Sequence, residues 1–224
     1  MLINADETVR ALVHADALPW VPSPQGEVDR RMLARIGDEV ALATTIVRYP
    51  KGAVFPSHTH ELGEEYLVLD GVFQDETGDH PAGRYVRNPP GSQHTPRAQN
   101  GAVIFVKLRD FDPADRRFVN LDIDSVEPHS DRQRPGVQVR DLHTDARETV
   151  SAETWTRDQR WQESFPHGAE LLVLQGHLTE SGDALRAWSW LRLPAGASVD
   201  AQVTSDTATV WIKRHRVPRP VRTP

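Results

Sequence analysis

Short apolar runs separated by polar and turn-forming residues make up most of this chain. Runs rich in Val, Ile, Leu, Phe and Tyr recur, and Gly, Pro, Asp or Asn closes each one. No long segment shows the 3.6-residue period of an amphipathic helix. The run Ala102–Leu108 has strong strand propensity throughout. The pattern predicts an all-β protein made of many short strands.

The individual strands are best defined in the first half. Residues Met32 to Tyr49 predict two strands or one bent one, and Gly83–Asn88 predicts another. Val9–His14 fits either a strand or a helical turn. Asp75–Asp79 contains a glycine and three acidic residues, so we interpret it as a solvated turn.

The second half of the chain repeats the first. Four blocks match in the same order, at shifts of 104 to 106 residues: Gly63–Gly71 with Gly168–Gly176, Glu76–Asp79 with Glu180–Asp183, Arg87–Gly91 with Arg192–Gly196, and Phe105–Lys107 with Trp211–Lys213. We therefore predict two tandem copies of one β-domain. The expected bounds are residues 1–123 for the first domain, 124–136 for a linker and 137–224 for the second domain.

Composition excludes several classes of function. The chain has 224 residues and a formal net charge of −6, without a basic stripe for phosphates, so nucleic acid is not an expected partner. Its apolar runs are too short to span a membrane, and its N-terminus lacks the pattern of a secretion signal. Cysteine is absent, which fits a cytoplasmic protein and leaves imidazole and carboxylate as metal ligands.

One stretch carries recognisable chemistry. His58 and His60 stand two residues apart in a strand-forming run, so both imidazoles point to one face, and Glu64 follows after a short turn. The next residue, Glu65, competes with Glu64, but strand alternation sends it to the other face. This arrangement predicts a metal site on a β-scaffold.

The spacing around these residues resembles the cupin motifs. Gly52, His58-Thr59-His60, Glu64 and Gly71 fit the first motif, and Gly83, Pro89, Gly91 and His94 fit the second. A position where the second motif usually has Asn is Ala98 here. The resemblance implies a double-stranded β-helix, a jelly-roll barrel, with one metal ion held by His58, His60, Glu64 and His94. Zn, Fe, Mn, Ni and Cu all suit three imidazoles and a carboxylate; we favour zinc.

The residues around the motifs are similar to the cupin domain of ChrR-type anti-sigma factors. The similarity is dense from about Pro19 to Leu108 and covers His58–Glu76 and Arg87–His94 most closely. Proteins of this type bind their sigma factor through a separate N-terminal zinc module that uses Cys and His. This chain has no cysteine, so sigma-factor binding is not expected from it.

The second copy lacks the ligands. At a shift of 105 residues the four positions become Glu163, Phe165, Ala169 and Val199, so we expect no metal there. Trp188 and Trp190 share a strand in this copy. We interpret them as core or subunit-interface residues, with an apolar ligand pocket as the alternative.

Two functional hypotheses follow, and the residues around the motifs favour the first. The first is a metal-binding bicupin with a sensor or regulatory role, responding to a small molecule or an oxidant. The second is a mononuclear metal-dependent dioxygenase acting on a small diketone or a related substrate. No acid–base residue beyond the ligands stands out, so catalytic residues are not assigned. Arg84, Arg87 and Arg97 flank the second motif, and one of them is a candidate for facing an anionic ligand. The remaining histidines, including His80, are expected at the surface, and the protein is expected to form a homodimer.

Overall fold

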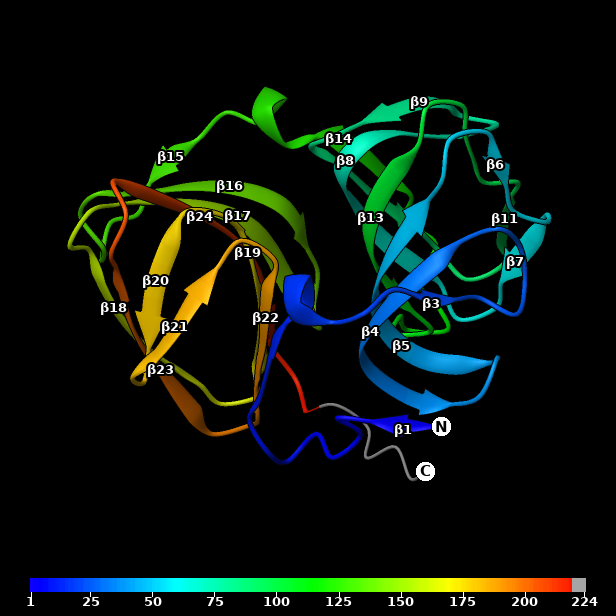
Figure 1. The fold of residues 1–224 in the computed structure, drawn as a ribbon. Coiled ribbons are helices and arrows are strands. Elements are labelled where there is room, and N and C mark those ends of the chain that lie inside the picture. Colours follow the sequence, from blue (N-terminus) through cyan, green and yellow to red (C-terminus); the bar gives the residue numbers. More distant parts are fainter. Residues whose placement is uncertain (219–224) are drawn as a thin grey trace. The chain divides into compact units, whose positions relative to one another are not determined.

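The protein folds into two compact all-β units. The computed structural model describes residues 1–218. The first unit holds Met1–Ala5 and Leu18–Asp124, and the second holds Asp6–Ala17 and the described residues from Ser125 onward. Both consist of antiparallel strands, and the described residues contain two short 3₁₀ turns in total, which confirms the expected fold class (Figure 1).

The first unit is built on one large curved sheet and one small one. The large sheet follows the order β1-β4-β5-β13-β8-β10-β14, and β7 pairs with β11 in the small one. The elements are β1 (Leu2–Ile3), β3 (Val21–Pro22), β4 (Asp29–Gly37), β5 (Ala41–Tyr49), β6 (Ala53–Val54), β7 (His58–His60), β8 (Glu64–Asp75), β9 (Gly78–Pro81), β10 (Arg84–Asn88), β11 (Ser92–His94), β12 (Arg97–Ala98), β13 (Ala102–Leu108), β14 (Val119–Asp122) and the 3₁₀ turn η2 (Ile123–Ser125).

The core of this unit follows from strand alternation. Tyr66 and Val68 of β8 pack with Ile104 and Val106 of β13 in one buried cluster. The residues between them, such as Glu65, face the opposite side of the same sheet. The same two strands therefore present one face to the core and the opposite face to polar contacts.

The second unit has the same plan. Its larger sheet follows the order β15-β16-β17-β24-β19-β22-β2, and its smaller sheet the order β18-β23-β20-β21. The elements are β2 (Ala11–His14), the 3₁₀ turn η1 (Ala15–Ala17), β15 (His129–Ser130), β16 (Val137–Thr144), β17 (Glu148–Thr156), β18 (Arg160–Phe165), β19 (Ala169–Gln175), β20 (His177–Glu180), β21 (Asp183–Arg186), β22 (Ser189–Leu193), β23 (Ala197–Val203) and β24 (Thr207–His215).

Strand pairing supports the repeat, because equivalent residues pair in the two units. In the first unit His94 of β11 lies opposite His58 of β7. In the second unit Val199 of β23 lies opposite Glu163 of β18. Both pairs are related by the shift of 105 residues that the sequence comparison used.

The expected domain bounds need correction at the N-terminus. Asp6–Ala17 belongs to the second unit, because β2 pairs with β22 along its whole length, from Ala11 opposite Arg192 to His14 opposite Ser189. The exposed edge of β22 takes a strand from a distant part of the chain, which a reading in chain order does not find. The expected linker, 124–136, also contains β15, which pairs with β16.

Two further expectations concern the C-terminal tail and the lack of membrane-spanning segments. The proline-rich residues Val217–Pro224 predict an extended arm, and most of them lie outside the described residues, which end at Pro218. Among residues 1–218, no helix is long and apolar enough to span a membrane.

Candidate metal centre

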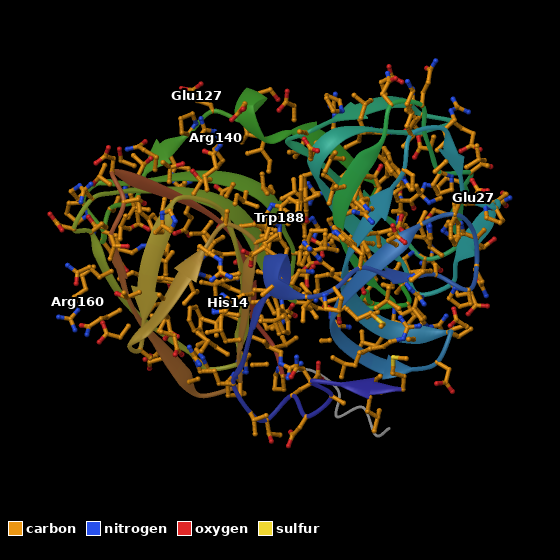
Figure 2. The ribbon with its side chains drawn as sticks, in the orientation of Figure 1. His14, Glu27, Glu127, Arg140, Arg160 and Trp188 are labelled. Carbon is orange, nitrogen blue, oxygen red and sulfur yellow. The ribbon has the colours of Figure 1, made fainter. Side chains whose placement is uncertain are left out.

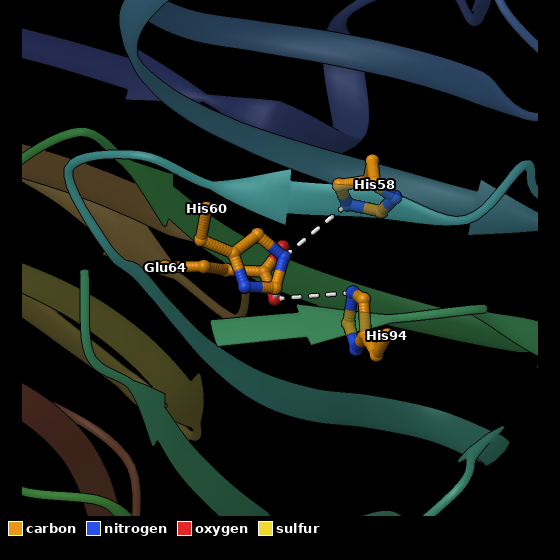
Figure 3. Close-up of side chains that lie close together, drawn as sticks. All are labelled: His58, His60, Glu64 and His94. Atoms are coloured by element: carbon orange, nitrogen blue, oxygen red, sulfur yellow. Dashed lines mark hydrogen bonds and ion pairs between the residues drawn. The ribbon is translucent and has the colours of Figure 1, made fainter. Parts of the chain in front are cut away.

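Four side chains converge at one end of the first unit. His58, His60, Glu64 and His94 each offer one ligand atom, and these atoms all lie within 4.8 Å of one another (Figure 3). The three imidazole rings are mutually edge-to-face, with centroids 4.5 to 4.9 Å apart. The structure thus brings together all four residues that the motifs predicted.

The local backbone explains this convergence. His58 and His60 alternate onto one face of β7, and antiparallel pairing with β11 places His94 directly across from His58. The chain then turns at Gly63, whose φ of +79° is a conformation that favours glycine. That turn brings Glu64, the first residue of β8, back beside the histidines.

Outer contacts orient the imidazoles on β7. His58 Nδ1 lies 3.0 Å from the carbonyl oxygen of Pro56, which only accepts, so this nitrogen carries the proton. His60 Nδ1 lies 3.0 Å from Ser92 Oγ, and that hydroxyl donates its own hydrogen to the Pro89 carbonyl at 2.7 Å. Ser92 Oγ therefore accepts from His60 Nδ1. In both residues Nε2 is left with its lone pair.

A buried carboxylate orients the third imidazole. His94 Nδ1 lies 3.2 Å from Asp75 Oδ2, and Asp75 Oδ1 accepts hydrogen bonds from Thr77 and His80. Burial opposes ionisation of Asp75, but hydrogen bonds from His80, His94 and Thr77 hold its pKa well below the usual range. Asp75 is therefore ionised, and His94 Nδ1 donates to it.

Three imidazole lone pairs consequently point at one place. His58 Nε2 and His60 Nε2 lie 3.2 Å apart, and His60 Nε2 lies 3.3 Å from Glu64 Oε2. Within residues 1–218, the buried His94 Nε2 finds no hydrogen-bond partner, although it lies 3.5 Å from the same oxygen. Converging lone pairs and a buried carboxylate repel one another unless a cation lies between them. These residues therefore fit a single metal ion.

Electrostatics favours the ligating forms of His60 and Glu64. Burial lowers the pKa of His60, and the neighbouring His94 and His58 lower it further, so its imidazole is neutral near pH 7. Burial alone would raise the pKa of Glu64, but the surrounding imidazoles and a hydrogen bond from Asn88 at 3.1 Å hold it below the usual value. Metal binding requires these same protonation states. At His94 the lowering of the pKa by burial is outweighed by the Asp75 hydrogen bond and the nearby Glu64, which raise it, so metal binding competes with a proton there.

Glu65 has a different role, as strand alternation predicts. It accepts a short hydrogen bond from the Tyr85 hydroxyl and lies 3.5 Å from the Arg87 guanidinium. All three residues are at most 2% exposed. Glu65 therefore belongs to a buried polar cluster on the other face of β8.

The expectation for Asp75 and His80 was wrong. Both are buried, and they form the hydrogen-bonded support behind His94. The acidic composition of Asp75–Asp79 suggested a solvated turn, but Asp75 is the last residue of β8 and its side chain points inward. Strand parity counted from Glu64 does not reveal this, because the pairing of β8 with β13 shifts register near Val68.

A cavity of about 310 Å³ opens on the candidate metal centre. His58, His60 and Glu64 line it at one end. Apolar side chains of β5 and β13, including Val47, line its wall. Its size is at the lower end of the range for small-molecule sites.

The arginines that line this cavity are not those expected from the motifs. Arg30, Arg35 and Arg109 line it. Arg87 is buried elsewhere, where it stacks on the Phe111 ring at 4.2 Å. The sequence offers no motif around Arg30 and Arg35, and only their placement on β4 reveals them.

The second unit has apolar side chains at three of the equivalent positions and an ion pair at the fourth. Phe165, Ala169 and Val199, at three of the four ligand positions, belong to its hydrophobic core. At the fourth, Glu163 pairs with Arg214 at 2.9 Å, and Arg214 also lies 2.9 Å from Glu153.

The tryptophans of the second unit have separate roles. Trp155 and Trp161 pack in the core with ring centroids 4.9 Å apart. Trp190 is fully buried and donates to Glu170 at 3.2 Å, in the place of the Tyr85–Glu65 pair of the first unit. Trp188, labelled in Figure 2, instead lies in the turn before β22. Its φ is +67°. The expectation that Trp188 and Trp190 share a strand was wrong.

Comparison with protein families supports the sequence resemblance. Residues 8–112 match the family model described as the ChrR cupin-like domain. The match spans both cupin motifs and all four candidate ligands. It confirms the resemblance to the ChrR-type cupin family over this part of the chain. No curated protein matches the chain significantly.

Solved structures with the same fold cover both units. A putative dioxygenase from Nostoc punctiforme matches with a TM-score of 0.78 at 14% identity, over 97% of this chain and 88% of that one. The Escherichia coli protein YlbA matches at 0.72 and 16%, over 97% and 95%. The E. coli pirin YhhW, solved with nickel(II), matches at 0.65 and 15%, over 93% and 100%. At these identities the likeness shows a shared cupin fold.

Proposed function

We propose that the first unit is a mononuclear metal centre that binds a small organic molecule from the adjoining cavity and acts on it as a metal-dependent enzyme. The observation that carries this proposal is the cavity itself, since three of the four candidate ligands form one of its ends. Four protein ligands leave positions on a six-coordinate ion for a substrate. An oxidant sensor would need access to the metal but no shaped organic pocket.

The protein residues would have two roles, holding the metal ion and orienting the ligands. His58, His60, Glu64 and His94 would hold the ion, and Asp75, Ser92 and the Pro56 carbonyl would keep the imidazoles oriented. The metal would supply Lewis acidity, or oxygen chemistry if it is iron. The apolar wall of the cavity would exclude water from the bound molecule.

Oxygen-dependent cleavage of a small diketone-like compound is the first reaction to test. The similarity in fold to a putative dioxygenase guides this choice of assay. The test is metal analysis of protein purified without added metal, followed by an oxygen-electrode screen of small diketones and oxo acids. Metal-dependent oxygen uptake with one of these compounds supports the enzyme.

A regulatory role is the second candidate, and the ChrR cupin-like match over residues 8–112 favours it. In that case the metal site binds its ligand without turnover, and zinc is the metal we favour. Zinc at one ion per chain, tight small-molecule binding and no turnover would support regulation and contradict the enzyme.

A further inference from the structure

The cavity beside the metal centre has a second polar region, formed by Arg30 and Arg35 of β4. The pairing of β4 with β5 shifts by one residue between Met32 and Ala34. Residues five apart on a regular strand face opposite sides, but a bulge restores them to one side. Both arginines accordingly line the cavity.

Arg35 is buried and Arg30 is partly buried, and both have little compensation for the loss of water. Arg35 is 5% exposed and donates to the Asp38 carbonyl, and the Arg30 side chain is 15% exposed. Arg30 lies 3.8 Å from Glu39, whose side chain is 45% exposed. Within the described part of the chain, the buried Nε of Arg30 has no hydrogen-bond partner.

The charge of Arg30 also acts on Arg35. Burial lowers the pKa of Arg35, and the nearby positive charge of Arg30 lowers it further. Buried cations are normally paired, so two neighbouring ones on a cavity wall favour an anion between them.

The charge of the whole cavity supports an anionic occupant. Its lining contains three arginines and three glutamates, with Glu64 among the latter. Arg109 is already paired with Glu61 at 2.7 Å. A divalent ion at the metal centre would add two positive charges. The cavity lining together with this ion would then have a net charge of +2.

The wall beside these polar groups is apolar. Val47 and Tyr49 of β5 and Ile104 and Val106 of β13 line it. Because Arg30 lies opposite Val47 in the β4–β5 ladder, the arginines continue the same face of the sheet. A matching ligand has a carboxylate, a short apolar segment and a second oxygen group.

We propose that the cavity binds a small organic carboxylate, whose carboxylate group pairs with Arg30 and Arg35 while its second oxygen group faces the metal centre. This inference rests on the proposed function, since it names the substrate class of the same cavity. A bidentate guanidinium–carboxylate pair gives both affinity and orientation.

Isothermal titration calorimetry on the zinc-loaded full chain tests this proposal. The probes are 3-oxobutanoate, 4-oxopentanoate and 5-oxohexanoate, each compared with its methyl ester. The variants are Arg30→Gln and Arg35→Gln. The matched control is Arg31→Gln, because Arg31 lies between them on β4 and stacks on Trp20, 4.1 Å from the ring centroid. Metal content and melting temperature are measured for each variant.

The wild type and Arg31→Gln should bind at least one acid about tenfold more tightly than its ester, because charged hydrogen bonds are the stronger ones. Each cavity variant should reduce this ratio to within about twofold while keeping its metal. Equal binding of acids and esters by the wild type would overturn the carboxylate site. A preference that survives in both cavity variants, or no binding by any of the six compounds, would overturn it too.

Metal-free protein separates this inference from the proposed function. If the acids bind equally well with and without metal, the carboxylate site stands and the proposed role of the metal in binding fails. If acids and esters both bind only to metal-loaded protein, with equal affinity, the metal's role stands and the carboxylate site fails.

Discussion

At the scale of single residues, the hydrogen bonds behind the ligands matter as much as the ligands. Each imidazole has its Nδ1 occupied by an acceptor, so only Nε2 is available for a metal. Spacing predicts the ligands because the first motif fixes three of them on β7 and β8 and the second motif fixes His94 on β11. It does not predict Asp75, whose inward direction depends on a register shift in β8 and on burial.

Replacing Asp75 with Asn should weaken metal binding without removing a ligand. The amide would leave His94 without a carboxylate partner, and lost support of this kind typically costs 10- to 100-fold in metal affinity. Chelator competition measures the effect. Asp79→Asn is the matched control, because Asp79 is an exposed residue of the same turn region. Equal metal affinity in Asp75→Asn and the wild type would contradict this role.

Substitutions at the neighbouring Glu64 and Glu65 should have different effects, one on metal binding and the other on stability. Glu64→Gln should lose the metal. Glu65→Gln should keep it and unfold more easily, because Tyr85 and Arg87 lose a buried charged partner, at a cost of about 3 kcal/mol. Metal content and urea unfolding of both variants check this. Loss of metal from Glu65→Gln alone would reverse the assignment.

At the scale of elements, tight turns hold the strands that carry the site. A side chain at Gly63 would overlap the Phe111 ring, and its φ is +79°. Gly91 has a similar φ of +86°, but within the described structure nothing lies within 4 Å of an added Cβ. The motif glycines mark both turns in the sequence, whereas the contact with Phe111 is visible only in the folded unit.

Alanine at these two glycines should therefore have unequal effects. Both variants incur the cost of a positive φ, about 1–2 kcal/mol. Gly63→Ala adds overpacking of about 1–3 kcal/mol and displaces the adjacent Glu64. Thermal unfolding and metal affinity measure the difference. Similar losses in both variants would show that contact with Phe111 has no effect.

At the scale of the whole molecule, one fold has been used for two kinds of interior. The repeat was predictable because turns and strand patterns persist in both copies. The assignment of β2 to the second unit was not, since local sequence carries no signal for its pairing with β22. Arg134 adds to the ion-pair network of the second unit, lying 2.7 Å from Glu153. The expected homodimer stays a prediction.

Breaking that network should destabilise the second unit alone. Arg214→Ala leaves the buried Glu153 with Arg134 as a remaining ionic partner, and the Glu163 side chain is 31% exposed, so the cost should be below the roughly 3–5 kcal/mol of breaking a fully buried pair. Calorimetry of metal-loaded protein should show a lower transition for the second unit, with metal content unchanged. Loss of metal from this variant would contradict the claim that the interior of the second unit is independent of the metal centre in the first.

The central claim is that His58, His60, Glu64 and His94 hold one metal ion. Its most direct test is the metal-to-protein ratio of the wild type and His94→Ala, measured by inductively coupled plasma mass spectrometry after purification without chelators. We predict one transition-metal ion per wild-type chain and a ratio near zero for the variant. A metal-free wild type that takes up no zinc, iron or nickel, or a variant with its full complement, would contradict the claim.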